Sequence, residues 1–140
     1  MRSSDFNASI GLNQLKKLKK ICWVRHKNFL RYKRQLKQFW SQQSQLSLIS
    51  SFGYATFVKN RTEVFRYLKK NNIQTRPLIC GNMGQQPFLK KISTNKKELI
   101  NAKFVDKNGI YLPNHANLKT KEIDKICDLF NSFAKPIFNN

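Results

Sequence analysis

Asn108-Gly109-Ile110-Tyr111-Leu112-Pro113 is the stretch from which the fold can be worked out. Asn-Gly is a common turn pair, and Ile-Tyr-Leu has the β-branched and aromatic content of a strand. Proline ends a strand because it has no N–H to donate to a neighbour. We therefore expect a turn at Asn108-Gly109 and a short strand at 110–112 that ends at Pro113.

Helical spacing of apolar residues is found on both sides of this strand. Before it, residues 95–105 place Leu99, Ile100 and Phe104 on one face. After it, residues 118–133 predict a closing helix, with Thr120 as a candidate N-cap and Pro136 as a stop. The apolar face of that helix consists of Ile123, Ile126, Cys127, Phe130 and Phe133.

Two further strands and one helix are expected upstream. Residues 52–58 alternate as a strand does, and residues 61–71 carry apolar residues at helical spacing. Residues 73–80 predict a second strand, which leads into a loop at 81–87 marked by glycine and proline. A loop after a strand is a common place for function, so this loop is expected to face a site.

The first 40 residues have the pattern of one long helix, or of two in line. Leu15, Cys22, Phe29 and Leu36 recur every seven residues, and Ser4 or Asp5 can cap the start. Lysines lie largely on the outer face, which is usually just a solvated surface. We expect this seam to pack on a domain.

The order of elements predicts an α+β fold, with a small mixed or antiparallel sheet of about three strands covered by helices. Residues 1–40 form the long helix in this prediction, and the Ser/Gln-rich segment 41–51 is a connection. Residues 52–140 form the α/β domain.

The net charge of +20, from 27 basic and 7 acidic residues, suggests an anionic partner. A basic nucleic-acid-binding module is therefore the alternative function, in which aromatic side chains stack on bases. The aromatic candidates are Trp23, Phe29, Tyr32, Phe39 and Trp40. Because lysine is accompanied by much asparagine, isoleucine and phenylalanine, which A/T-rich codons encode, we favour genome composition as the source of the charge.

Cysteine and histidine are too scattered for a metal centre or a disulfide framework. Cys22, Cys80 and Cys127 are odd in number and far apart, and neither His26 nor His115 lies at metal-ligand spacing from another ligand. No apolar run has the length of a membrane span, and no leader pattern follows Met1. We expect no metal, no membrane partner and a cytoplasmic location.

Residues 74–87 hold the densest group of candidate binding residues. Arg76 could bind a carboxylate or phosphate with its guanidinium fork, or form a structural salt bridge. Asn82 and Gln86 could bind sugar hydroxyls, but amides equally stabilise turns, and Gly81 and Gly84 could supply a positive φ.

His115 is the remaining candidate, in a loop between the last strand and the last helix. Its imidazole could act as an acid or hydrogen-bond donor, although a histidine that only fixes a turn is the more common case.

One resemblance follows the chain almost from end to end. Arg2-Ser3-Ser4-Asp5-Phe6-Asn7-Ala8-Ser9-Ile10-Gly11-Leu12-Asn13-Gln14-Leu15 resembles the R-(S/M)-(S/T)-(D/E)-x-(N/Q)-A-x-I-G-x-x-Q-L stretch of DegT/StrS sugar aminotransferases. Further matches follow in the family's order: Gly53-Tyr54, Thr75-Arg76-Pro77, Gln86-Pro87-Phe88 and Leu112-Pro113-Asn114-His115.

The resemblance implies the C-terminal small domain of a fold-type I enzyme that depends on pyridoxal phosphate. In the family a large upstream domain holds the cofactor through a Schiff-base lysine, so this chain is expected to lack catalytic residues and to be inactive alone. Reassembly with a separately made large domain is a third hypothesis.

The family acts as a homodimer on nucleotide-linked keto-sugars, with glutamate as amino donor, in surface polysaccharide synthesis. Segment 76–87 looks closer to the branch acting on 4-keto-6-deoxyhexose nucleotides, which includes 3-dehydratases, so transamination and dehydration both stay open. Arg76 is carried over as substrate-facing, with Asn82 and Gln86 as companions and His115 as a loop position.

Overall fold

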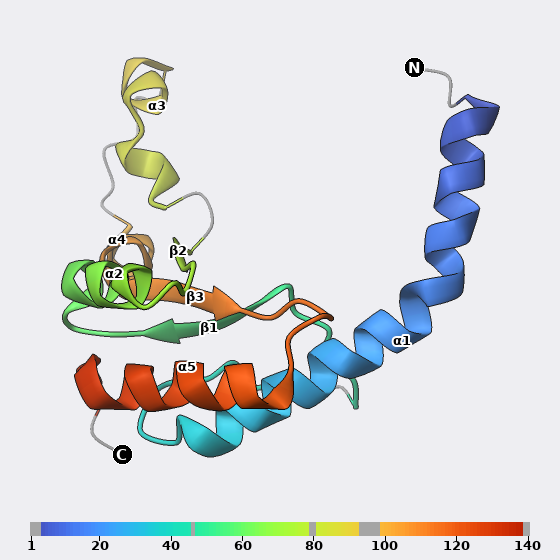
Figure 1. Cartoon of the computed structure of the whole chain (residues 1–140). Coiled ribbons are helices and arrows are strands. Elements are labelled where there is room, and N and C mark those ends of the chain that lie inside the picture. The colour runs from blue at the N-terminus through green and yellow to red at the C-terminus, as the bar shows by residue number, and fades with distance from the viewer. Residues whose placement is uncertain (1–3, 46, 79–80, 93–98, 139–140) are drawn as a thin grey trace.

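The computed structural model describes residues 4–45, 47–78, 81–92 and 99–138 (Figure 1). Within them a small sheet is surrounded by helices, which confirms the expected α+β class. The elements are α1 (Asp5–Gln35), β1 (Gly53–Phe57), α2 (Arg61–Lys70), β2 (Arg76–Pro77), the 3-10 helix η1 (Met83–Gln85), α3 (Pro87–Ile92), α4 (Ile100–Asn108), β3 (Gly109–Pro113) and α5 (Thr120–Phe133).

The sheet has the strand order β1-β3-β2, and both neighbouring pairs are antiparallel. Tyr54 of β1 is opposite Leu112, and Arg76 of β2 is opposite Tyr111. Since β1 and β2 both run against β3, they are parallel to each other, and α2 is the crossover between them. The stretch 110–112 therefore lies in the central strand.

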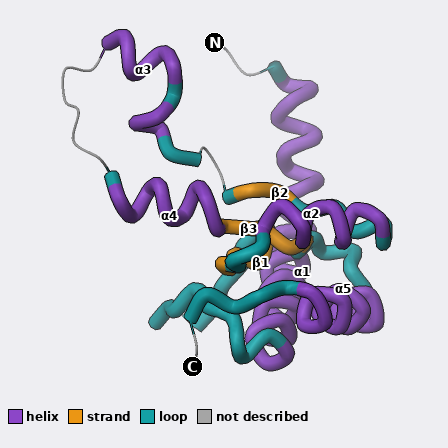
Figure 2. Tube along the Cα trace, turned by 90° about the vertical axis from the view of Figure 1, so that its left-hand side faces the viewer, coloured by secondary structure: helices purple, strands orange, loops and turns teal. Residues whose placement is uncertain are grey.

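The core lies between one face of the sheet and helices α1, α2 and α5, which lie together on one side of the sheet in Figure 2. Tyr32 of α1 stacks on Tyr54 of β1 with ring centroids 5.0 Å apart, and Phe39 meets Phe130 of α5 at 4.8 Å. The opposite face is covered in part by α4, because Phe104 packs against Phe57 of β1 at 5.4 Å. Alternate residues of β1 therefore face different layers.

Helix α1 begins as expected but ends earlier. The Ser4 hydroxyl accepts a hydrogen bond from the Asn7 N–H at 3.3 Å, which confirms Ser4 as the cap. The expected end near residue 40 is wrong, because the helix stops at Gln35. Leu36 and Phe39 are both buried, and the chain turns between them to place both side chains in the core.

Only the second half of α1 packs on the rest of the chain. Every residue from Ser4 to Lys20 is exposed, and this half of the helix projects from the body in Figure 1. Phe29 and Leu36 of the seven-residue seam are buried, as expected, whereas Leu15 is 62% exposed. The apolar seam therefore continues into the first half of α1, where none of the described residues buries it.

The segment expected as a second strand is mostly irregular. Only Arg76 and Pro77 pair with β3, and Pro77 cannot donate to the ladder; Ile79 and Cys80 lie outside the described residues. The expected loop at 81–87 instead contains η1 and the start of α3. Neither helix was predicted from the sequence, because both are too short to show the helical period of apolar residues.

Gly109 is needed for space rather than for a turn. Helix α4 runs to Asn108 and passes directly into β3, so the expected Asn-Gly turn and the expected helix end at residue 105 are wrong. Gly109 has an extended backbone, with φ −77°. A Cβ there would lie 2.5 Å from a methyl of Leu78 and 2.6 Å from the Val105 carbonyl oxygen.

The start of α5 also differs from the expectation. Thr120 is the first helical residue rather than the cap, and the N-cap position belongs to Lys119. The Lys119 backbone N–H donates to the Glu122 carboxylate at 2.6 Å, which satisfies one donor at the helix start.

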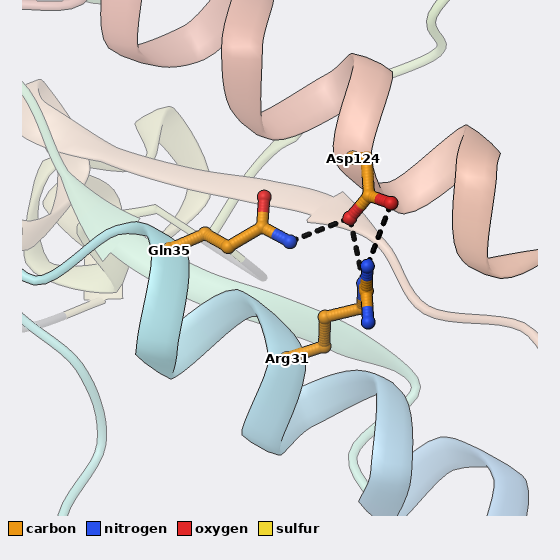
Figure 3. Close-up of polar contacts among 3 residues, drawn as sticks. All are labelled: Arg31, Gln35 and Asp124. Atoms are coloured by element: carbon orange, nitrogen blue, oxygen red, sulfur yellow. Dashed lines mark hydrogen bonds and ion pairs between the residues drawn. The ribbon is translucent and has the colours of Figure 1, made fainter.

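Three polar side chains join α1 to α5 (Figure 3). Arg31 donates to both carboxylate oxygens of Asp124, at 2.6 and 2.7 Å, and Gln35 donates to the same carboxylate at 2.5 Å. The hydrogen bonds from Arg31 and then Gln35 hold the pKa of Asp124 below its usual range. The cluster sets how the two helices sit side by side.

Asp124→Asn is expected to lower the unfolding temperature at neutral pH. Because the folded-state pKa of Asp124 is lowered, its stabilising effect is present above the ordinary carboxyl pKa and is lost as pH falls through the lowered value. Thermal unfolding followed by circular dichroism should show variant and wild type converging in acid. Asp128→Asn, at an exposed position on the same helix, is the control, and equal effects of the two substitutions would contradict this role for Asp124.

The exposed apolar residues of α1 are expected to make the isolated chain self-associate. Added salt should strengthen association, since it screens the repulsion between chains of net charge +20. Sedimentation velocity at increasing concentration measures this, and Leu12→Glu with Leu15→Glu should reduce it. A monodisperse monomer at all salt concentrations would show the expectation to be wrong.

Candidate functional site

A groove of about 570 Å³ opens where β2 stops pairing with β3. The register that pairs Arg76 with Tyr111 would next bring residue 75 opposite Leu112, but these two residues are not paired. Segment 71–74 leaves β3 at this point, and the first turns of α5 form the other wall. A concave site of this size is in the range that small ligands occupy.

Arg76 and His115 lie in this one groove. Arg76 comes from β2, and His115 follows β3 by two residues, so they are brought together from positions 39 residues apart. Both residues are exposed. A guanidinium and an imidazole that share a groove can bind an anionic or hydroxyl-rich ligand.

Asn114 fixes the loop that presents His115. It is 1% exposed, and its amide nitrogen donates to the carbonyl oxygens of Arg25 at 3.2 Å and Ser51 at 2.9 Å. Its Oδ1 has no hydrogen-bond partner, and the residue lies in the groove wall. The sequence offered no signal for this role, since its partners are 63 and 89 residues away.

Asn82 and Gln86 lie outside the groove residues. Asn82 is 3% exposed, and its Oδ1 accepts from the Gly84 N–H at 3.1 Å, which caps η1. Gln86 is half-buried just after η1. The turn role that amides commonly take is thus observed for Asn82, and substrate contact by either residue stays a prediction. Gly81 has the expected positive φ of 55°.

The groove also contains residues that sequence reasoning missed. Phe52, Tyr111, Glu122 and Lys125 all line it. They come from the residue before β1, from β3 and from α5, so no local motif connects them.

The described side chains do not form a pyridoxal-phosphate site. Every lysine whose side chain is described is exposed, so none occupies the enclosed position that a Schiff-base lysine needs. Of the cysteines in the described part, Cys22 and Cys127 are free, and burial raises the pKa of the Cys127 thiol to about 12. No cluster of three metal-ligating residues was found in the same part of the chain.

Most of the aromatic side chains that the nucleic-acid-binding hypothesis needs for stacking on bases are buried. Phe29, Tyr32 and Phe39 are at most 3% exposed, because they belong to the core. Trp23 and Trp40 are the two that reach the surface. The basic charge and these two tryptophans are left to support this alternative.

The chain belongs to the DegT/DnrJ/EryC1/StrS aminotransferase family, whose sequence profile matches residues 1–131. It is 30% identical over 138 residues to the GDP-4-keto-6-deoxy-D-mannose 3-dehydratase of Escherichia coli. The match covers 89% of this chain and 34% of that enzyme. The lipopolysaccharide biosynthesis protein RfbH of Salmonella typhimurium is 25% identical, over 95% of this chain and 33% of its own length.

Solved structures give the same grouping. The Escherichia coli 3-dehydratase with bound hydrated pyridoxal phosphate superposes with a TM-score of 0.77 at 28% identity, covering 88% of this chain and 34% of that one. Helicobacter pylori PseC, an aminotransferase, shares the fold with a TM-score of 0.81 at 23% identity, over 95% of this chain and 39% of its own.

The chain spans about a third of the length of the curated relatives it matches. The relatives are pyridoxal-phosphate enzymes, which confirms the cofactor expected for the family. None of the helices in the described ranges combines the length and apolarity needed to cross a bilayer.

Asn114→Ala is expected to destabilise the fold by about 1–3 kcal/mol, because it removes two part-buried hydrogen bonds, to the carbonyl oxygens of Arg25 and Ser51. Urea unfolding followed by tryptophan fluorescence measures this loss. Asn117→Ala, at an exposed position three residues later, should change stability little. Equal midpoints for the two variants would rule out the anchoring role of Asn114.

Proposed function

We propose that this chain is the substrate-side part of a pyridoxal-phosphate-dependent enzyme that acts on nucleotide-linked keto-sugars for surface polysaccharide synthesis of the lipopolysaccharide type. The observation that carries the proposal is the family match over residues 1–131, with relatives three times as long. Because the relatives at or above 28% identity are 3-dehydratases, we favour a 4-keto-6-deoxy sugar as the substrate.

The cofactor would be held by the remaining two thirds of the enzyme. Exposure of the described lysines agrees with this division of labour. The proposal includes cytoplasmic activity as a homodimer with glutamate as amino donor, and it leaves transamination and 3-dehydration as the two reaction types. The chain alone would then be inactive.

Exposed apolar residues on two projecting elements support the proposal that a larger part of the enzyme packs against this chain. The free half of α1 and the α3 region both extend from the same side of the molecule in Figures 1 and 2. The exposed residues on them include Phe6, Ile10, Leu12, Leu15, Leu18, Met83 and Phe88. Apolar surface of this extent is typical of an interface.

Arg76 is the residue we assign to the substrate within the groove. Its guanidinium is exposed there and can form paired hydrogen bonds with a phosphate or carboxylate. His115, which lines the same groove, would add a hydrogen bond.

The proposal is tested with a chimera in which this chain replaces the matching third of the Escherichia coli 3-dehydratase. The chimera should bind pyridoxal phosphate, seen by its visible absorbance, and convert a nucleotide-linked 4-keto-6-deoxy sugar. Arg76→Gln should lower kcat/KM about tenfold to a hundredfold, the cost of a lost hydrogen bond to a charged group.

Arg66→Gln, at an exposed position on α2 outside the groove, is the matched control and should retain activity. A folded chimera that holds the cofactor yet converts no such sugar would refute the proposal. The two parts produced separately and mixed would test reassembly, and no gain of absorbance or turnover would exclude it.

A further inference from the structure

Arg25 of α1 is a half-buried cation without a counter-charge in the described part of the chain. Its Nε is buried and has no hydrogen-bond partner there. By contrast, Arg31 on the same helix is also half-buried and donates to both carboxylate oxygens of Asp124. A buried donor that lacks an acceptor costs free energy, so native proteins contain few of them. Arg25 therefore indicates an acceptor that another part of the protein brings to it.

The position of Arg25 is the boundary between the packed and the exposed half of α1. Asn28 and Phe29, one turn later, are buried, whereas every residue from 4 to 20 is exposed. The Asn114 amide donates to the Arg25 carbonyl oxygen at 3.2 Å. The body of this chain thus fixes the backbone of Arg25 and leaves its charge unpaired.

Arg25 also occupies a position in the apolar seam of α1. At spacings of four, three and four residues the seam runs through Leu18, Cys22, Arg25 and Phe29. Arg25 is not among the residues that line the groove, so a ligand bound there is not its counter-charge. A single charged residue in an apolar helix seam can fix the register of the helix on its partner, because every other alignment leaves the charge desolvated and unpaired.

We propose that Arg25 forms an ion pair with a carboxylate of the remaining two thirds of the enzyme, and that this pair sets the register in which the exposed half of α1 docks. The assignment rests on the proposed function, because it takes that larger part as the occupant of this face. Leu15 and Leu18, which are 62% and 51% exposed on the same seam, become covered by the same surface. The net charge of +20 favours an acidic covering surface.

Arg25→Met tests the assignment, because methionine fills a similar space without charge or donors. In this chain alone the substitution removes an unpaired buried donor, so the unfolding temperature should stay the same or rise. In the chimera with the Escherichia coli 3-dehydratase it leaves the partner carboxylate unpaired, so the unfolding temperature should fall. Thermal unfolding followed by circular dichroism measures both values.

Two further variants identify the acceptor as a carboxylate. Arg25→Lys keeps the charge and should recover part of the stability of the chimera, whereas Arg25→Gln keeps donors without charge and should behave as Arg25→Met does. When the two parts are made separately and mixed, Arg25→Met should raise their Kd about tenfold to a hundredfold, the cost of a lost hydrogen bond to a charged group. Wild-type stability of the Arg25→Gln chimera would show a neutral acceptor and overturn the ion pair.

Arg34→Met is the matched control, since it removes an exposed arginine from the packed half of the same helix. It should leave the unfolding temperatures of chain and chimera unchanged. Equal falls for Arg25→Met in chain and chimera would show a role inside this chain only, and they would overturn the assignment. Equal effects of Arg25→Met and Arg34→Met on the chimera would do the same.

These results are distinguishable from a failure of the proposed function. If the chimera converts its sugar nucleotide and Arg25→Met leaves its unfolding temperature unchanged, only the assignment of Arg25 is wrong. If Arg25→Met lowers the unfolding temperature of the chimera alone, but the cofactor-loaded chimera converts no such sugar, the proposed function is wrong and the ion pair stands.

Discussion

The position of Tyr32 is the constraint on which the rest of the structure depends. Its ring is fully buried against Tyr54 of β1, and its hydroxyl donates to the Pro113 carbonyl oxygen of β3 at 2.9 Å. One side chain therefore attaches α1 to two adjacent strands. Arg31 and Gln35, on the same half of the helix, add the polar contact with α5. Helix, sheet and closing helix are thereby held in one arrangement.

The groove is a consequence of incomplete strand pairing. Since β2 contributes only two paired residues, the far end of β3 is paired with β1 on one side and with no strand on the other, and side chains from four separate segments gather at that unpaired edge. Asn114 stabilises this open edge by hydrogen bonds to α1 and to the segment before β1. A ligand site thus arises where the sheet is least complete, which is common where backbone and side chains both need access.

Periodicity predicted the long elements well because burial of one face controls them. Phe29 and Leu36 of the seven-residue seam, and Ile123, Ile126, Cys127 and Phe130 of α5, are buried as their spacing requires. The same pattern could not show that Leu15 has nothing to pack on, since hydrophobic spacing describes a face and not its partner. Of the candidate site, Arg76 and His115 share the groove, whereas Phe52 and Lys125 meet there through tertiary contacts that no local spacing encodes.

The second half of helix α1 packs on the core, whereas its first half is exposed. A small tilt of the packed half therefore produces a larger displacement at the exposed end. Residues 5–20 extend roughly 24 Å beyond the packed part at a rise of about 1.5 Å per residue, so a tilt of about 5° moves the tip by about 2 Å. Small adjustments around Tyr32 and Asp124 would be magnified at the start of the helix. The alignment of that distant end is thus controlled by side chains in the core, several turns away.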